Sequence, residues 1–239
     1  MRRFYDDQPF SIAQLTELGE EASHHIGKVL RMQPGDEIVL FNGRGGEWQA
    51  RIDSIGKRHV FVVPLQHQPD DRTPSCKVHL ALPLIKGDRM DYALQKATEL
   101  GAASFQLLST ERTDVRLDGG RTEKRMQHWQ QVVISACEQC GLNRIPAVHA
   151  PIALNGYLQQ ERDGSCLIAH PGEAAIDMTT LQQATSIHLL TGPEGGFSSA
   201  EIELARTHGF QPFALGQRVL RAETAPTALL AAIWMARGG

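Results

Sequence analysis

Two stretches near the carboxyl end of the chain carry residues that could hold a ligand. In LTGPEGG (190–196) an apolar run stops at a turn with three glycines, and a capping box at Ser198 and Glu201 then starts a helix. Glycine admits backbone angles that other residues avoid, and it lets a flat ligand touch the main chain. A tight strand-to-helix connection needs one or two glycines. Three glycines with a proline and a carboxylate therefore favour a ligand site over a simple connection.

The spacing of this turn excludes two common phosphate-binding motifs. The sequence has no G-x-G-x-x-G, and no Gly-Lys-Ser or Gly-Lys-Thr follows the turn as a P-loop requires. Glu194 would also repel a phosphate at this place, whereas it suits a neutral or cationic ligand.

The second stretch, LGQRVLRAETA (215–225), has the same design. A glycine follows an apolar strand, and a helix begins with Pro226 in its first turn. In an open α/β sheet, ligands bind beyond the carboxyl ends of the strands, so two adjacent strands that end in such loops would form one pocket. The helix after Ala225 is apolar nearly all round, which indicates a place in the core or under a second subunit. We expect a contact between subunits there.

Alternating patterns around these loops predict an α/β fold with a parallel sheet. Apolar strands are expected at 78–85, 104–110, 165–171, 187–193 and 210–216, mostly separated by helical patterns. The clearest helix covers 88–100, and Gly101 ends it. From Glu37 to Leu65, short strands joined by glycine turns predict a small β-barrel or sandwich. The polar stretch at 68–74 with two prolines reads as a linker, so we predict domains at 1–72 and 73–239.

Composition narrows the class of protein. The chain has 239 residues, of which 41% are hydrophobic, and its formal net charge is -3. This suffices for a packed globular core, and the longest apolar stretch (228–236) is too short to cross a bilayer. We therefore expect a cytoplasmic protein. Cys137 and Cys140 form a C-x-x-C, but both fall on the buried stripe of one helix and no second pair stands at zinc spacing, so we interpret them as structural and expect no metal.

With these loops in view, the chain resembles the ribosomal RNA small subunit methyltransferase E family of the SPOUT class. The segments that carry the resemblance are HHIGKVLRM (24–32), LPLIKGDRMDYALQKATELG (82–101), ERT (111–113), EQCGLNRIP (138–146), LTGPEGGFSSAEI (190–202) and LGQRVLRAETA (215–225). The resemblance implies a cytoplasmic homodimer that methylates N3 of one uridine in 16S ribosomal RNA of the small subunit. It also implies an N-terminal PUA-like RNA-binding β-barrel and a parallel sheet with a C-terminal trefoil knot. Asp114 after ERT and Pro226 after ETA depart from the usual family pattern.

The resemblance implies that the two loops hold S-adenosylmethionine in the knot. The residues expected to bind this cofactor are Leu190, Thr191, Gly192, Glu194, Gly195, Gly196, Leu215, Gly216, Val219, Leu220, Arg221, Thr224 and Ala225.

Methylation at N3 of uridine raises a question of proton transfer, because this nitrogen carries a proton that must leave before or during attack. Glu223 is our candidate for the general base, and Arg221 is our candidate for stabilising the uracil anion. The alternative for this pair is an exposed ion pair that caps the last helix. Glu194 is the second candidate for the base.

RNA contacts need cations and flat side chains. In the first domain we expect them from Arg2, Arg3, His25 and Arg31, on one basic face of a domain that is not basic overall. In the second domain we expect them from Lys86, Arg112, Arg116 and Arg144. Two other functions stay open: a related knotted enzyme that methylates the ribose 2'-O, and a non-catalytic RNA-binding protein that keeps the fold.

Overall fold

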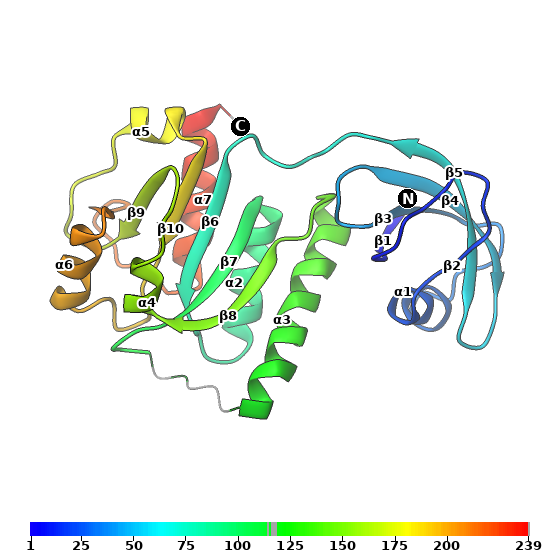
Figure 1. The fold of residues 1–239 in the computed structure, drawn as a ribbon, viewed down its shortest axis with the longest axis horizontal. Coiled ribbons are helices and arrows are strands. Elements are labelled where there is room, and N and C mark those ends of the chain that lie inside the picture. Colours follow the sequence, from blue (N-terminus) through cyan, green and yellow to red (C-terminus); the bar gives the residue numbers. More distant parts are fainter. Residues whose placement is uncertain (114, 116–118, 239) are drawn as a thin grey trace. The chain divides into compact units, whose positions relative to one another are not determined.

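The chain folds into two compact units in a computed structural model that describes residues 1–113, 115 and 119–238 (Figure 1). The first unit comprises Met1–Thr73 and Ile134–Ile145, and the second comprises Pro74–Val133 and Pro146–Gly239. The predicted boundary at residue 72 lies within one residue of the first break. Residues 134–145, however, cluster with the first unit, although the sequence assigned them to the second domain.

The first unit is built on a five-stranded sheet with the order β1-β3-β4-β5-β2. The strands are β1 (Arg2–Tyr5), β2 (Thr16–Glu17), β3 (Glu37–Phe41), β4 (Glu47–Ile55) and β5 (Val60–Gln68). The strands predicted between Glu37 and Leu65 are therefore confirmed. Helix α1 (Glu20–His24) continues into the π-helix η1 (His25–Val29), and apolar residues of both pack with the sheet around Phe4, Ile38 and Ile52.

Residues 134–145 join this unit through polar contacts to β1. Helix α3 (Gly119–Cys140) brings Glu138 to the sheet, where its carboxylate accepts a hydrogen bond from the Tyr5 amide at 3.0 Å. Cys137 is buried in the same helix, and burial raises the pKa of its thiol. A buried, protonated thiol agrees with the structural interpretation of this cysteine.

The second unit contains a six-stranded, fully parallel sheet with the order β11-β9-β10-β6-β7-β8. Its strands are β6 (Lys77–Pro83), β7 (Ala102–Ser109), β8 (Ala147–Ala153), β9 (Ser165–Ala169), β10 (Ser186–Leu190) and β11 (Gln211–Phe213). This confirms the predicted parallel α/β sheet. Strand β8 was not predicted. The expectation that the strands before the two glycine loops are adjacent was wrong, because β9 lies between β10 and β11.

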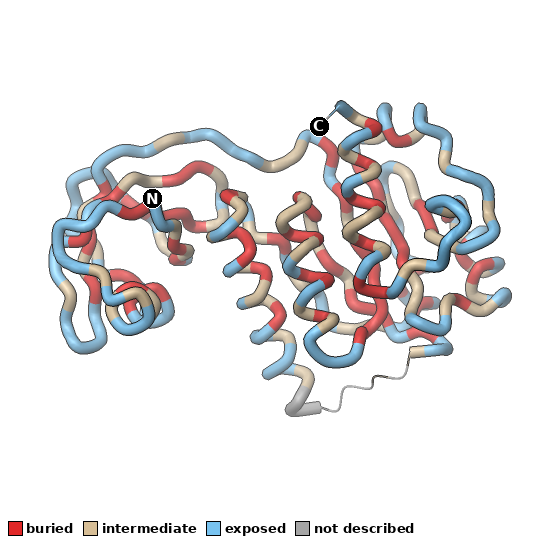
Figure 2. Tube along the Cα trace, turned by 180° about the vertical axis from the view of Figure 1, so that it is seen from behind, coloured by how far each residue is buried: buried red, intermediate tan, exposed pale blue. Residues whose placement is uncertain are grey.

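Helices connect these strands and cover the sheet. Besides α3, which links β7 to β8, they are α2 (Asp88–Glu99), α4 (Leu154–Leu158), α5 (Met178–Gln183) and α6 (Ser199–Thr207), and α7 (Thr224–Arg237) follows the last strand. Helix α2 buries Met90, Leu94 and their neighbours, and Gly101 follows its end with a φ of 77°. Figure 2 shows the buried residues gathered on the strands and on one side of these helices. Within the described residues no helix is long and apolar enough to cross a membrane.

Candidate active site

A cleft of about 690 Å³, partly open to solvent, lies where strands β9, β10 and β11 end. The turn after β10 and the loop after β11 form most of its wall. The predicted cofactor residues that line it are Thr191, Gly192, Glu194, Gly196, Leu215, Gly216, Val219, Leu220 and Ala225. The two glycine loops therefore do meet at one pocket, as the sequence indicated, with the end of β9 between them.

Four predicted cofactor residues do not line this cleft. Leu190 is fully buried in the core at the end of β10. The carbonyl of Gly195 faces a different partner, since it accepts a hydrogen bond from Arg112 Nη1 at 2.7 Å. Arg221 and Thr224 are exposed and stand outside the wall of the cleft, although Ala222 and Ala225 belong to it.

The glycines of the cleft are needed for both conformation and space. Gly196 and Gly216 have φ values of 66° and 70°, a region that side chains with a Cβ avoid. At Gly192, a Cβ would lie 3.2 Å from the ring of Phe197, which is closer than such contacts usually come. The positive φ values and the close contact with Phe197 explain why glycines occur in these loops.

Two buried polar atoms in the cleft have no hydrogen-bond partner among the described residues. They are the hydroxyl oxygen of Thr191 and Nδ1 of His170. Because a buried polar atom without a partner is costly, such atoms favour a ligand that supplies one. The rest of the wall is largely apolar and includes Phe213, Leu220 and Leu229. An amphipathic ligand with a flat ring and several polar groups, such as S-adenosylmethionine, fits this combination.

His170 and Phe213 were not predicted as site residues. Both stand where a strand ends, His170 after β9 and Phe213 at the end of β11. The predicted strand at 165–171 carried a usable signal, because its last residues had to reach the same sheet edge as the glycine loops.

A second cleft of about 350 Å³ adjoins the first. The two clefts share Pro193, Glu194 and Ala222 in their walls. The second cleft adds two cations, Lys86 from the segment after β6 and Arg112 from the segment after β7. Two predicted RNA contacts thus lie next to the predicted cofactor pocket.

Two carboxylates lie at or near this shared wall: Glu194 lines both clefts, whereas Glu223 follows Ala222 in sequence and lines neither. Glu194 forms an ion pair with Arg89, which belongs to α2. The side chain of Glu223 is only 10% exposed, and its Oε1 lies 4.0 Å from Nη1 of Arg221, whose side chain is 79% exposed. Glu223 does not cap α7 with its side chain, and its Oε2 is buried without a hydrogen-bond partner among the described residues. The alternative of an exposed capping ion pair therefore does not describe Glu223.

Comparison with known proteins identifies the family. A family model described as an RNA methyltransferase domain matches residues 72–234, and one described as an RNA methyltransferase PUA domain matches residues 18–65. The ribosomal RNA small subunit methyltransferase E of Bacillus subtilis is 34% identical over 225 residues, which cover 90% of this chain and 87% of that protein. This chain belongs to the ribosomal RNA small subunit methyltransferase E family. The expected resemblance is thereby confirmed.

Solved structures of similar proteins agree with this assignment. The small subunit methyltransferase E of Neisseria gonorrhoeae, solved with S-adenosylmethionine, has a TM-score of 0.92 at 36% identity and covers 98% of this chain and 97% of its own. A Legionella pneumophila protein solved with the same bound cofactor has a TM-score of 0.93 at 39% identity, with coverage of 98% and 97%. The fold of this chain is thus the fold of a ribosomal RNA small subunit methyltransferase E.

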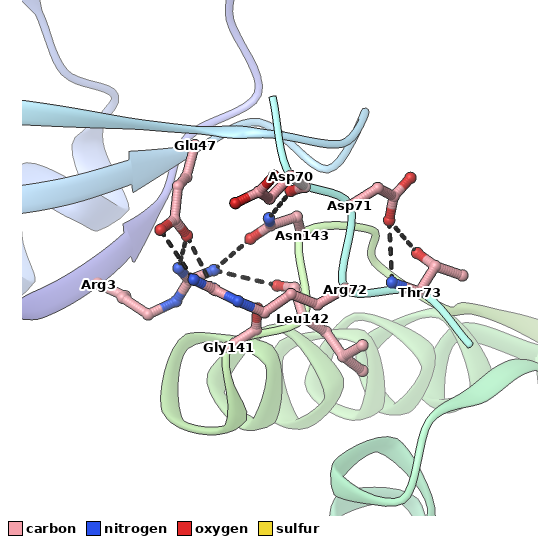
Figure 3. A network of polar contacts seen from close by, with 9 residues as sticks. All are labelled: Arg3, Glu47, Asp70, Asp71, Arg72, Thr73, Gly141, Leu142 and Asn143. Atoms are coloured by element: carbon pink, nitrogen blue, oxygen red, sulfur yellow. Dashed lines mark hydrogen bonds and ion pairs between the residues drawn. The ribbon is translucent and has the colours of Figure 1, made fainter. Parts of the chain in front are cut away.

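Membership in the methyltransferase E family does not decide which cations bind RNA, and the structure changes part of our expectation. The guanidinium of Arg3 is mostly buried in an ion pair with Glu47 and also donates to Oδ1 of Asn143 at 2.6 Å, which favours a structural role over an RNA contact (Figure 3). Arg144 donates through Nε to Asp71 at 2.6 Å, although about half of its side chain stays exposed. Both arginines hold the first unit together.

The other predicted RNA contacts are placed as follows. Arg2 and Arg31 are exposed. The ring of His25 packs edge-on against Phe4, with the centroids 5.6 Å apart. Lys86 and Arg112 line the second cleft. Arg116 lies outside the described residues, as does Asp114.

Proposed function

We propose that this chain is an S-adenosylmethionine-dependent methyltransferase that acts on N3 of a uridine in 16S ribosomal RNA. The observation that carries the proposal is the pair of adjoining clefts. One has glycine loops and unsatisfied buried polar atoms, the other has two cations, and they share a wall. This pair occurs in a chain of the methyltransferase E family, and a family member from Neisseria gonorrhoeae binds S-adenosylmethionine.

The first cleft holds the cofactor. Thr191 and His170 supply the polar atoms, the backbone at Gly192 and Gly216 allows close approach, and Phe213 with Leu220 supplies apolar surface. When bound, S-adenosylmethionine supplies a methyl group on a positively charged sulfur. Glu194 at the shared wall suits this positive charge, whereas it would disfavour a phosphate-bearing cofactor. Because methyl transfer needs little beyond alignment, fixing the two partners in adjoining clefts accounts for much of the rate.

The second cleft receives the uracil base and its neighbouring phosphates. Lys86 and Arg112 provide the positive charge that RNA requires. Arg112 is held by its hydrogen bond to the carbonyl of Gly195, so the cation that meets RNA is tied to the turn that borders the cofactor. Through this hydrogen bond, RNA that binds Arg112 also stabilises the conformation of the turn at 190–196.

Glu223 takes the proton from N3. A base needs a free acceptor, and Oε2 of Glu223 is a buried oxygen without a partner among the described residues. Ala222, the preceding residue, lines both clefts, so Glu223 lies directly beside the shared wall although it is not itself part of either lining. Arg221 pairs only loosely with Glu223 and is largely exposed, which leaves its guanidinium available to stabilise the uracil anion. Glu194 is the second candidate base, but its carboxylate is already paired with Arg89.

Further features of the proposal follow from family membership. The first unit closes as a PUA-like β-barrel and binds RNA, and the segment around the cofactor loops is threaded as a trefoil knot. The protein works as a cytoplasmic homodimer on the small ribosomal subunit. Two exposed apolar side chains support the dimer: Val219 in the cofactor loop is 75% exposed and Met235 on α7 is 82% exposed. A second copy would cover both.

Methyl transfer to small subunits from a strain that lacks the enzyme tests the function. With S-adenosylmethionine labelled in the methyl group, the label should enter one uridine of 16S ribosomal RNA, and digestion to nucleosides should yield 3-methyluridine. A methylated ribose would show the 2'-O chemistry instead. Binding of RNA without any affinity for S-adenosylmethionine at millimolar concentration would show a non-catalytic RNA-binding protein.

A further inference from the structure

A basic groove lies in the first unit, and none of the residues that the sequence predicted for RNA binding there, Arg2, Arg3, His25 and Arg31, lines it. The groove lies between helix α1 with η1 on one side and the turn that joins β4 to β5 on the other. The space in it, including the part open to solvent, is about 940 Å³. Three cations line it, namely Lys28, Lys57 and Arg58, together with His24 and one carboxylate, Glu20. The groove thus carries net positive charge in a unit where acidic residues outnumber lysines and arginines.

The three cations differ from four arginines of this unit that are held in ion pairs. Arg3 and Arg72 pair with Glu47, Arg44 pairs with Asp7, and Arg144 pairs with Asp71. By contrast, Lys28, Lys57 and Arg58 make no ion pair or hydrogen bond with the described residues, and all three are exposed. Paired arginines stabilise the unit, whereas unpaired cations gathered in one groove are free to bind an anion.

The walls of the groove are fixed by hydrogen bonds and packing. The buried hydroxyl of Ser23 donates to the carbonyl of Leu18 and accepts from the Val60 amide, which ties α1 to β5. The amide of Gly56 donates to the carbonyl of His59 at 2.7 Å, closing the turn that presents Lys57 and Arg58. Helix η1 lies close to β4 at Gly27, whose Cβ position is 3.4 Å from Cγ2 of Ile55, an ordinary van der Waals distance. The π-helix η1 therefore places Lys28 opposite the turn, and π-helical turns often mark functional sites.

We infer that this groove binds the sugar–phosphate backbone of the ribosomal RNA substrate outside the target base. The inference rests on the proposed function and adds a contact that none of Arg2, Arg3, His25 or Arg31 supplies. Lysines and arginines with free side chains bind phosphates without reading sequence, so the groove should increase affinity and position the RNA. Discrimination of the target uridine stays with the clefts of the second unit.

Salt-dependent RNA binding tests the groove in the full-length protein. The variant Lys28→Gln/Lys57→Gln/Arg58→Gln should bind a fluorescent 16S ribosomal RNA fragment about tenfold more weakly, or worse, at 0.1 M salt. The slope of log affinity against log salt should become shallower by about 2, since each phosphate contact with single-stranded RNA contributes about 0.7. An unrelated RNA of equal length should lose affinity equally. Binding of S-adenosylmethionine should stay at the wild-type value.

Two controls keep the test sharp. Arg51→Gln removes an exposed, unpaired cation of β4 that does not line the groove, and it should leave both affinity and slope unchanged. The variant Lys28→Arg/Lys57→Arg keeps the charge and should bind like wild type. The thermal unfolding midpoint shows whether the triple variant is folded. If the folded triple variant keeps the wild-type affinity for RNA and the wild-type salt slope, the groove does not bind RNA, and the proposed function is unaffected. If the wild-type protein neither binds nor methylates ribosomal RNA, the proposed function itself is wrong.

Discussion

His79 and His188 stack face to face on neighbouring strands of the second unit, with ring centroids 4.9 Å apart and ring planes within 14°. The two residues are register partners on β6 and β10. Burial lowers the pKa of both rings, and for His188 the adjacent His79 lowers the pKa further. Nδ1 of His79 lies 2.7 Å from the Ser104 hydroxyl. Nε2 of His188 is buried without a hydrogen-bond partner among the described residues, and the carboxylate nearest to it, the exposed Asp163, is 3.8 Å away and only partly offsets the effect of burial on the pKa. The stack is thus built for neutral rings.

The stability of the protein should therefore fall in mild acid. Since the folded-state pKa of each histidine lies below its unfolded value, the unfolded chain binds more protons as the pH falls. The contribution of the stack is complete above about pH 6.5 and is lost as the pH falls below this value. Urea unfolding at several values between about pH 7.5 and pH 5 measures the effect. This window is separate from that of Glu47 and Asp71, whose lowered pKa values affect stability below about pH 4.5.

A pair of variants assigns the effect to the stack. His188→Phe keeps a ring against His79 but cannot be protonated, so the dependence of unfolding free energy on pH should become shallower. His24→Gln changes an exposed histidine on α1 whose side chain makes no hydrogen bond or ion pair with the described residues, and it should leave the dependence unchanged. An equal pH dependence in wild type and His188→Phe would show that the stack does not control acid stability.

The cofactor cleft should be sensitive to a side chain at Gly216 but not at a similar glycine elsewhere. Gly216 and Gly209 have φ values of 70° and 81°, and neither has an atom within 4 Å of its Cβ position. An alanine at either position should cost about 1–2 kcal/mol of stability through the backbone conformation. Of these two glycines, Gly216 lines the cleft and Gly209 does not. Calorimetric titration with S-adenosylmethionine should show at least tenfold weaker binding for Gly216→Val and wild-type affinity for folded Gly209→Ala.

Arg3 should prove to be a structural residue rather than an RNA contact. Its side chain is 11% exposed and pairs with the buried Glu47, whereas Arg44 is 63% exposed and pairs with the exposed Asp7. Breaking the buried pair leaves a carboxylate with less compensation, so Arg3→Gln should lower the unfolding free energy by about 3 kcal/mol. Arg44→Gln should cost about 1 kcal/mol or less. Denaturant unfolding of both variants checks this, and equal losses would contradict the role assigned to Arg3.

The elements with strong local patterns could be predicted from the sequence. Helix α2 has an apolar stripe and a terminal glycine, and α6 has its capping box, in which Ser198 accepts from the Glu201 amide at 3.2 Å. Strands β1 and β8 were missed for the opposite reason. Strand β1 has only four residues and begins with two arginines, and β8 is a largely exposed edge strand that contains Pro151. Neither strand has a pattern that stands out without its neighbours.

The candidate site also has features that the sequence could predict and features that it could not. The glycine loops at 190–196 and 215–225 could be found because their residue types are unusual after a strand. The order of the strands could not be found, since the position of β9 between β10 and β11 depends on long-range pairing. The ion pair of Arg3 could not be found either, because its partner Glu47 lies 44 residues away. His170 was missed because the end of β9 has no glycine to mark it.

Replacing each candidate base by its amide should identify the group that takes the proton from N3. Glu223→Gln keeps the shape of a buried side chain but removes the carboxylate, so the rate of methyl transfer should fall by about 10²–10⁴-fold while affinity for S-adenosylmethionine stays unchanged. Glu194→Gln should reduce the rate less, because its carboxylate is paired with Arg89. Glu203→Gln, an exposed change on α6, serves as the control. A larger loss in Glu194→Gln than in Glu223→Gln, measured in single turnovers with small subunits, would transfer the role of base to Glu194.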